Sequence, residues 1–393
     1  MKLLILIATK RNKQLFDMAY QYALGKGYEV FAVNTYKENK DDLSGDRSNP
    51  EIFSDPRPFI AIAQILNVDA VVCLSSEKTL ERDALIKKEL ENTGVIVIAQ
   101  SLETIETLLY KEQAKRYFQN NKIPTSPGGI VKAQHELKEL VDLLGFPLVT
   151  KRSRGAGGMG NNILENYDDL NIFINGRKYF GEEILVEKFI NGIELAIEIV
   201  GHNGHYICTP LIYQGKTKIT GGHPIKNLSY VPYGEAGVRE SVENIALKIA
   251  NELNLCGCAE LEIIWEPYSN SIHVLEVNLR TGGNTLLGMA YTNINIPAML
   301  IDMADNTWNN NLDVVTTDKL SVQLDLIPGL SKSVIDKVFS LPTFFKCSKQ
   351  NKNGQCVKFI LSGKKSDIMA DIDKIKLLEV SLRLKNSSDL YRL

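Results

Sequence analysis

Residues 260–283 constrain this chain more than any other segment, because they predict a hairpin with charged side chains along one face. Two apolar-rich runs flank a Pro-Tyr-Ser-Asn turn, which is the pattern of two paired antiparallel strands. Since side chains alternate along a strand, Glu276, Asn278 and Arg280 share one face, and the apolar residues between them share the other. Unpaired polar groups on a buried face cost roughly 1 to 3 kcal/mol each, so a charged ligand is expected against them.

The oxygen-bearing side chains of this hairpin predict a Mg2+ site, because Mg2+ prefers carboxylates together with the phosphate oxygens of a substrate. The second strand supplies a carboxylate and an amide, and the first strand leaves two candidates for the facing ligand. A loop that pairs Pro267 with Ser271 sets Glu262 opposite Glu276, whereas a longer loop brings Glu260 there. A solvated hairpin with ordinary surface charges is the alternative, and other segments have to decide.

Length and composition indicate a globular protein of two or three domains, since 393 residues can build several cores. The net charge of -2 argues against a nucleic-acid surface. Residues 3–8 are too short for a signal-peptide core, and no run approaches the roughly 20 apolar residues that span a bilayer. The six cysteines are scattered, and Cys256 and Cys258 lack the second pair of a zinc site, so a reduced, cytoplasmic protein is expected.

Strand and helix patterns alternate over the first hundred residues, which predicts a parallel sheet with helical crossovers. The expected strands are residues 3–8, 29–33, 70–74 and 95–99, and the helices between them include residues 14–24 and 79–92. Residues 37–58, rich in Asp, Asn, Ser and Pro, predict a long loop with a functional role. A further helix is expected at residues 102–120, with Lys111 and Lys115 one turn apart.

The glycine-rich segment 151–160 predicts a phosphate-binding loop that follows a short strand. Backbone N–H groups beside glycines can surround a phosphate, and Lys151 adds a positive charge. Gly155, Gly157 and Gly160 also spell the dinucleotide-binding pattern, but that pattern belongs to a first strand-to-helix turn. A turn without a ligand is the third alternative, and the basic residues around it argue against that.

Two further segments carry candidate ligand-binding groups. A polar break between two strands, within residues 184–200, predicts an edge for a flat heterocycle, where Glu187 accepts from an exocyclic amine and Glu194 from sugar hydroxyls. A charged hairpin rim is the alternative. Lys218 and His223 lie in a loop with two glycines that is expected near an acceptor substrate, and plain exposed polarity is the alternative there.

Taken in order, these motifs resemble those of the ATP-grasp superfamily, from the amino terminus to about residue 300. The resemblance rests on the lysine-bearing helix before an Ile-Pro-Thr turn, the Lys151 strand with its glycine loop, the Glu187-Lys-Phe hinge, Gly192-Ile-Glu194, and Glu262 with the Glu-Val-Asn-Leu-Arg ending. It implies an α/β fold that is α+β in its catalytic part. A Rossmann-like pre-ATP-grasp domain is expected at 1–105, an ATP-grasp domain at 106–305 and a small C-terminal domain at 306–393. Within the ATP-grasp domain, a central subdomain is expected at about 125–190 and a metal-binding part at about 190–305.

The resemblance also implies a role for each matched position, with Lys151 and Arg280 as the catalytic residues. The ATP phosphates are expected to contact Lys111, Lys151 and the loop residues Gly157, Gly158 and Met159. Adenine is expected at Glu187 and the backbone of Lys188, Phe189 and Ile190, and ribose at Glu194. Two Mg2+ ions, which Mn2+ can replace, are expected at Glu262, Glu276 and Asn278, with Arg280 holding the phosphoryl-bearing intermediate. Arg152 and Leu279 stand where the family commonly has proline, and neither change removes a ligand.

The implied reaction joins a carboxylate to an amine at the cost of ATP. The carboxylate attacks the γ-phosphate, an acyl phosphate forms, and the amine displaces phosphate while cationic groups stabilise the oxyanion. Small-molecule substrates are expected, amino acids first, with no nucleic-acid or membrane partner and a homodimer as in relatives. A carboxylase or nucleotide-pathway ligase is the alternative, and a non-catalytic ATP-binding module is the second alternative.

Overall fold

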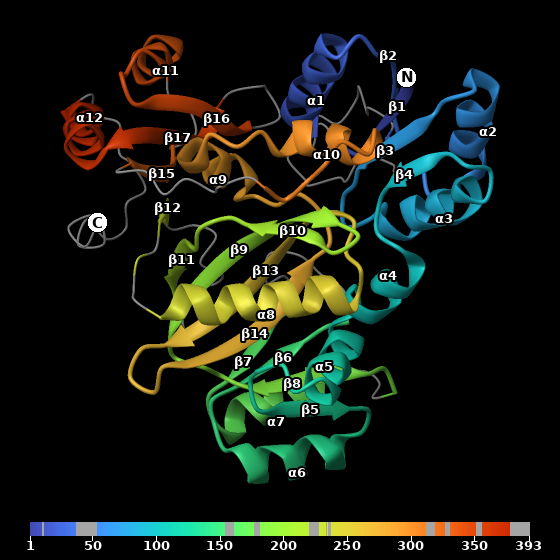
Figure 1. Ribbon diagram of the computed structural model, residues 1–393. Helices are drawn as coiled ribbons and strands as arrows, with labels where there is room; N and C mark the ends of the chain where they lie inside the picture. Colours follow the sequence, from blue (N-terminus) through green and yellow to red (C-terminus); the bar gives the residue numbers. More distant parts are fainter. Residues whose placement is uncertain are drawn as a thin grey trace.

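The computed structural model describes most of the chain and assigns it to sheets flanked by helices (Figure 1). The described residues are 1–9, 12–36, 53–153, 161–176, 181–219, 228–232, 234, 237–311, 319–326, 331–350 and 356–377. Gly157, Gly158, Met159, His223 and most of the loop at 37–58 lie outside them, so the expectations for those residues stay predictions.

The amino-terminal sheet has the order β2-β1-β3-β4, and its strands pair in parallel, as predicted. The strands are β1 (Lys2–Ile7), β2 (Glu29–Asn34), β3 (Ala70–Leu74) and β4 (Ile96–Ile98). Helix α1 (Lys13–Gly25) covers one face together with α10 (Ile296–Ala304), and α2 (Arg57–Leu66) and α3 (Leu80–Glu91) cover the other. Strand β3 is buried along its whole length because helices pack on both faces.

The single helix expected at residues 102–120 is wrong, because the chain forms two helices, α4 (Leu102–Leu108) and α5 (Lys111–Asn120). Tyr110 between them has an extended backbone, and its hydroxyl donates to Glu81 on α3 at 2.6 Å. The backbone N–H of Lys111 donates to Ser153 O at 3.0 Å. These contacts with distant segments break the helix and make Lys111 the first residue of α5.

A smaller antiparallel sheet has the order β5-β8-β6-β7 and lies beside α5 (Figure 1). Its strands are β5 (Gly128–Val131), β6 (Leu148–Lys151), β7 (Asn162–Leu164) and β8 (Ile184–Lys188). Helices α6 (Gln134–Leu144) and α7 (Tyr167–Gly176) pack on it through an apolar cluster that includes Leu137, Leu148 and Val186.

The largest sheet has the order β14-β13-β9-β11-β12-β15-β17-β16, with β10 paired to β9. Its strands are β9 (Ile193–His202), β10 (His205–Cys208), β11 (Ile212–Lys216), β12 (Ser229–Val231), β13 (Gly257–Glu266), β14 (Ser271–Asn278), β15 (Lys319–Asp325), β16 (Phe344–Gln350) and β17 (Cys356–Lys364). The carboxy-terminal strands thus extend the same sheet through β12, and the domain boundaries stay predictions.

Helices cover the largest sheet on its apolar face and at its carboxy-terminal end (Figure 1). They are α8 (Val238–Glu252), α9 (Thr285–Thr292), α11 (Lys332–Phe339) and α12 (Lys365–Leu377). Helix α8 packs on alternate residues of β9 and β13, among them Ile197, Leu261 and Ile263. Within the described ranges, no helix combines the length and apolar character needed to cross a membrane.

The expectation of a fully reduced set of cysteines is wrong for one pair. Cys347 on β16 and Cys356 on β17 form a disulfide, with their Cα atoms 5.8 Å apart. The two strands are antiparallel neighbours, so the hairpin brings together residues whose pairing the sequence pattern did not reveal. Cys73, Cys208, Cys256 and Cys258 are free and buried.

Gly128 on β5 tests the packing of the smaller sheet, because a side chain there has no room. A Cβ at Gly128 would lie 2.2 Å from Val186 O and 2.8 Å from Glu187 Cα, whereas one at Gly129 would meet only Leu140 methyl groups at 4.0 Å. We expect Gly128→Ala to lower the free energy of unfolding by about 1 to 3 kcal/mol. Gly129→Ala, the matched control, should change it by less than about 0.5 kcal/mol. Urea unfolding of both variants measures this, and equal effects would contradict it.

Candidate functional site

The β13–β14 hairpin places the predicted metal ligands side by side. Glu262 pairs with Glu276 and Glu260 pairs with Asn278, which decides between the two registers left open by the sequence. The turn pairs Glu266 with Ser271, and a bulge next to Glu262 restores the register nearer the strand ends. Glu262 therefore faces Glu276 across the hairpin.

The neighbouring strand β9 adds two more carboxyl groups to this face of the sheet. Glu198 lies opposite Glu260, and Glu194 lies opposite Ile264, two positions along the strand from Glu262. Because residues two apart share a face, the three adjacent strands carry their acidic side chains on the side away from α8.

Burial, with repulsion between neighbouring carboxylates as a second cause, raises the pKa values of several of these carboxyls. Burial, together with Glu276, Glu260 and Glu194, raises the pKa of Glu262 well above its ordinary value. Burial also raises the pKa of Glu194 to about 7, with a further contribution from Glu276. Burial acts the same way on Glu276, but the Lys111 ammonium outweighs it and holds that pKa below its ordinary value.

The donor set fits Mg2+, because two facing carboxylates and an amide provide hard oxygen ligands whose mutual repulsion a cation relieves. Lys111 forms an ion pair with Glu276 and so supplies a positive charge at the same place. The Asn278 amide nitrogen donates to Glu262 Oε1 at 3.0 Å and contacts Glu276 Oε1 at 3.4 Å. Among the described residues, no group of three or more His, Cys, Asp or Glu side chains is placed so that it could hold a metal ion.

A second charged group lies on the smaller sheet and α5. Glu187 is 3% exposed, and its two oxygens contact Lys115 Nζ and Lys151 Nζ, each at 2.7 Å. Burial alone raises the pKa of Glu187, but these two ammonium groups hold it below its ordinary value. The charges of Glu276 and Glu194 also help to raise the pKa of Lys151. The lysines around Glu187 and the acidic face of the largest sheet are therefore close enough to interact.

The predicted adenine hinge follows β8. The backbone N–H groups of Lys188 and Phe189 donate to Pro127 O at 2.7 Å and Pro147 O at 3.0 Å. The Lys188 ammonium donates to the carbonyl of Leu144, the last residue of α6, and to the carbonyls of Gly145 and Phe146, which follow the helix. Among the described residues, the N–H of Ile190 has no backbone acceptor, so it is the hinge donor left for a ligand.

The remaining predicted residues lie around this space. Arg280 Nε is 3.6 Å from Glu77 Oε2, in the turn after β3, and its Nη1 donates to Thr281 O at 3.1 Å. Lys218 is exposed, and the neighbouring Thr217 is tied to Gly192 by a 3.0 Å backbone hydrogen bond. The structure thus brings Lys111, Lys151, Glu187, Glu194, Glu262, Glu276 and Asn278 together, with Arg280 at the edge nearest β3.

Two buried polar residues in and beside the site were not predicted from the sequence. Lys115 was noted beside Lys111 but received no role, although it is 1% exposed and paired with Glu187. The one-turn spacing of Lys111 and Lys115 was the feature of the sequence that could have indicated its role, because it places both lysines on one side of the helix. Glu198 gave a usable signal as well, because it continues the alternation that begins at Glu194.

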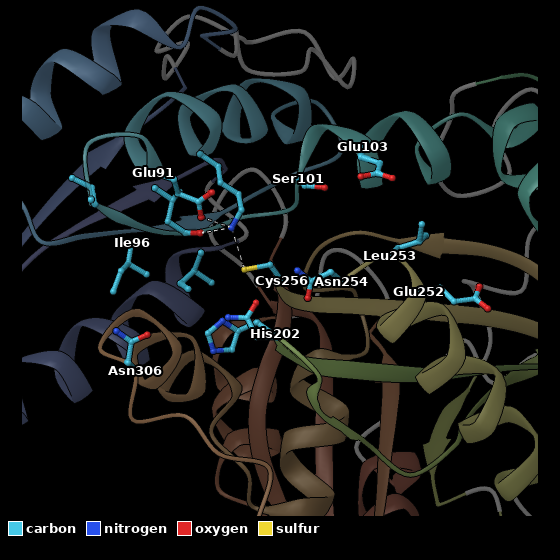
Figure 2. A pocket seen from close by; sticks show the side chains of 16 residues that line it. Glu91, Ile96, Ser101, Glu103, His202, Glu252, Leu253, Asn254, Cys256 and Asn306 are labelled. Carbon is cyan, nitrogen blue, oxygen red and sulfur yellow. Dashed lines mark hydrogen bonds and ion pairs between the residues drawn. The ribbon is translucent and has the colours of Figure 1, made fainter.

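Two cavities mark different parts of the molecule. A small one, about 20 Å3, lies where α4 and α5 meet β14, and its lining combines Lys111, Glu276 and Asn278 with apolar residues such as Leu108 and Val277. A larger one, about 500 Å3, lies between α3, β4 and the end of α8 (Figure 2). It contains Cys256 and His202, with Glu103 and Glu252 toward one end, and none of the predicted site residues lines it.

Similarity to known proteins agrees with this geometry. The ATP-grasp domain family matches residues 116–292. A carbamoyl-phosphate synthase of Methanobrevibacter smithii is 30% identical over 303 residues, which cover 75% of this chain and 79% of that protein. The chain spans about a quarter of the large-chain carbamoyl phosphate synthases that it also matches, for example 24% of the one from Pseudothermotoga lettingae.

Two solved structures share the fold. The biotin carboxylase domain of Hydrogenobacter thermophilus 2-oxoglutarate carboxylase, in complex with MgADP, superposes with a TM-score of 0.73 at 16% identity, covering 99% of this chain and 94% of that one. An N5-carboxyaminoimidazole synthase from Aspergillus clavatus, in complex with ADP, gives a TM-score of 0.69 at 17% identity, covering 95% and 98%.

The chain belongs to the ATP-grasp family. It is an ATP-dependent enzyme of the ADP-forming ligase and carboxylase group, as the sequence predicted. Enzymes of this family use ATP and Mg2+.

The raised pKa of Glu262 predicts a pH-dependent gain of stability when its charge is removed. A folded state with a raised carboxyl pKa binds more protons than the unfolded state, so stability falls as pH rises from the ordinary value to the raised one. Glu262→Gln has no proton to lose, and we expect its melting temperature to gain on the wild type, without metal, as pH rises above the ordinary glutamate pKa of about 4.3. The exposed Glu89→Gln is the control and should show no such trend. If the melting temperature of Glu262→Gln fell further below that of the wild type as pH rises, the raised pKa of Glu262 would be contradicted.

Proposed function

We propose that this protein is an ATP-dependent carboxylate–amine ligase that joins small molecules through an acyl phosphate and releases ADP and phosphate. The observation that carries the proposal is Glu262 facing Glu276 beside Asn278, with Lys111 and Lys151 directed toward the same space. A protein that only bound a nucleotide would need no such set of metal ligands.

ATP is assigned to the space between the smaller sheet and the acidic face of the largest sheet. The phosphates are assigned to Lys111 and Lys151, and, from the sequence pattern, to Gly157, Gly158 and Met159. Glu187 and the backbone from Lys188 to Ile190 receive the adenine, with the Ile190 N–H as donor. Glu194 receives the ribose. Lys115 keeps Glu187 ionised and in place through their 2.7 Å contact.

Glu262, Glu276 and Asn278 are assigned to two Mg2+ ions, for which Mn2+ can substitute. When bound, these ions neutralise the charge on the phosphate oxygens during transfer. Lys111 then exchanges its Glu276 partner for a phosphate oxygen, and Arg280 holds the acyl phosphate and stabilises the oxyanion formed on amine attack. Lys218 and His223 are assigned to substrate contact.

The domain assignments belong to the same proposal. Residues 1–105 form a pre-ATP-grasp domain of Rossmann-like topology, residues 106–305 the ATP-grasp domain and residues 306–393 a small C-terminal domain. Support for the first is its parallel sheet, whose β3 turn reaches Arg280 through Glu77. The enzyme is assigned as a homodimer, since the biotin carboxylase domain with the same fold is described as a dimer.

Bicarbonate as the carboxylate is the second candidate, and the relatives favour it. The protein 30% identical over 79% of its length is a carbamoyl-phosphate synthase, and the two superposed structures are a biotin carboxylase domain and an N5-carboxyaminoimidazole synthase. Activation of bicarbonate to carboxyphosphate uses the same phosphate and metal groups. The product then carries a new carboxyl or carbamate group instead of an amide.

A substrate screen separates these candidates. Purified enzyme with MgATP is incubated with amino-acid pairs, and with bicarbonate plus an amine, while phosphate release and product mass are followed. Phosphate release that requires two amino acids supports amide formation, whereas release that requires only bicarbonate supports the second candidate. Formation of AMP, or no carboxylate-dependent turnover at all, contradicts both.

Glu276 tests the metal site directly. We expect Glu276→Gln to lower kcat at least about 100-fold, because a lost metal ligand removes several kcal/mol of charge stabilisation from the transition state. Glu266→Gln is the matched control, since Glu266 lies at the turn end of the same hairpin and contacts His273 instead. Steady-state phosphate release measures both variants, and full activity of Glu276→Gln would remove this residue from the site.

A further inference from the structure

Two buried carboxyl groups lie next to the proposed metal ligands and are not among them, although one of them, Glu260, is hydrogen-bonded to Glu262. Glu198 and Glu260 face each other across β9 and β13, with exposed fractions of 0% and 3%. Glu260 shares its row of the sheet with Asn278, one step further from the turn than Glu262. Buried polar side chains usually have specific hydrogen-bond partners, and the partners of Glu260 and of Glu198 Oε1 indicate what these carboxyls hold. Glu198 Oε2 has no hydrogen-bond partner among the described residues.

The partners of both carboxyls belong to the turn that directly follows Arg280. The Asn284 amide donates to Glu260 Oε2 at 2.8 Å, and the Thr285 hydroxyl donates to Glu198 Oε1. Thr285 also accepts from the backbone N–H of Gly282 at 2.8 Å. The Thr285 hydroxyl therefore connects the buried carboxyl to the backbone two residues beyond Arg280.

The turn is also packed tightly onto these carboxyls. A Cβ on Gly282 would lie 2.8 Å from Glu260 Oε1, and one on Gly288 in α9 would lie 3.3 Å from Glu198 Oε2. Arg280 itself donates to the carbonyl oxygen of Thr281, the first residue of the turn. The position of the guanidinium is thus linked to a backbone segment that the two carboxyls hold.

We propose that Glu198 and Glu260 are positioning residues, which hold the turn at 281–285 through Thr285 and Asn284 and thereby aim Arg280 at the anion in the metal site. The inference rests on the proposed function only in giving Arg280 an anion to hold. Neither carboxyl touches substrate. They influence the reaction only by fixing the position of the Arg280 guanidinium.

Thr285 allows a test that leaves both buried carboxyls in place. Thr285→Val keeps the shape of the side chain and removes the hydroxyl, whereas Thr285→Ser keeps the hydroxyl and is the matched control. We expect Thr285→Val to lower kcat by about 10- to 100-fold, the size expected when a catalytic group is misplaced by about 1 Å. The KM for ATP should stay within about twofold of the wild type, because the nucleotide groups are unchanged. Thr285→Ser should restore kcat to within about threefold.

Anion binding provides a readout that needs no knowledge of the substrates. Calorimetry measures the affinity of the Mg–ADP complex for inorganic phosphate, with Arg280→Ala as the reference for a lost guanidinium. We expect Thr285→Val to weaken phosphate binding in the direction of Arg280→Ala, and Thr285→Ser to match the wild type.

The outcomes separate this inference from the proposed function. Wild-type enzyme without carboxylate-dependent turnover ends the proposed function, while the phosphate comparison still judges the positioning role. Unchanged kcat and phosphate affinity in Thr285→Val overturn the inference. Equal losses in the Val and Ser variants also overturn it, since they trace the effect to packing and not to the hydroxyl. Absence of phosphate binding in the wild type overturns it too.

Discussion

Crowding of carboxyl groups on one face of the largest sheet is the constraint on which the rest of the site depends. Glu194, Glu260, Glu262 and Glu276 come together because β9, β13 and β14 are neighbours and present the same face. Burial raises the pKa values of Glu194, Glu260 and Glu262, and the charge of the neighbouring Glu276 raises them further. The Lys111 ion pair relieves part of the repulsion. A face of this kind is suited to divalent cations, whose charge removes the remainder.

The two faces of β9, β13 and β14 serve different functions, one in packing and one in ligand binding. Leu261 and Ile263 pack under α8 in the main apolar cluster, so the hairpin is anchored from the side opposite to its ligands. The facing group on the smaller sheet is built in another way, since Glu187 is held between Lys115 and Lys151. One surface is thus rich in negative charge and the other carries paired lysines. A magnesium–nucleotide complex, with a cation at one end and phosphates beside it, matches both surfaces.

Local patterns predicted much of the site, and non-local contacts explain the errors. Strand alternation was enough to put Glu276 and Asn278 on one face, because the period of two is a property of the backbone. The break at Tyr110 was missed, since its hydroxyl partner Glu81 is 29 residues away in sequence. The disulfide between Cys347 and Cys356 was missed because two strands had to pair before the thiols could meet. Lys115 received no role because its partner Glu187 lies on another sheet.

By itself, the sequence determined which side chains share a face, where the glycine-rich loop falls and that carboxylates, an amide and lysines recur in the order typical of ATP-grasp enzymes. These are consequences of residue type and of the fixed geometry of strands. Only the tertiary structure decided that Glu262, and not Glu260, faces Glu276, because a bulge in the hairpin sets the register. It also gave Glu260 a different partner in Asn284, since the turn after Arg280 folds back onto the sheet. Contacts of this kind depend on which strands become neighbours, and no local pattern encodes that choice.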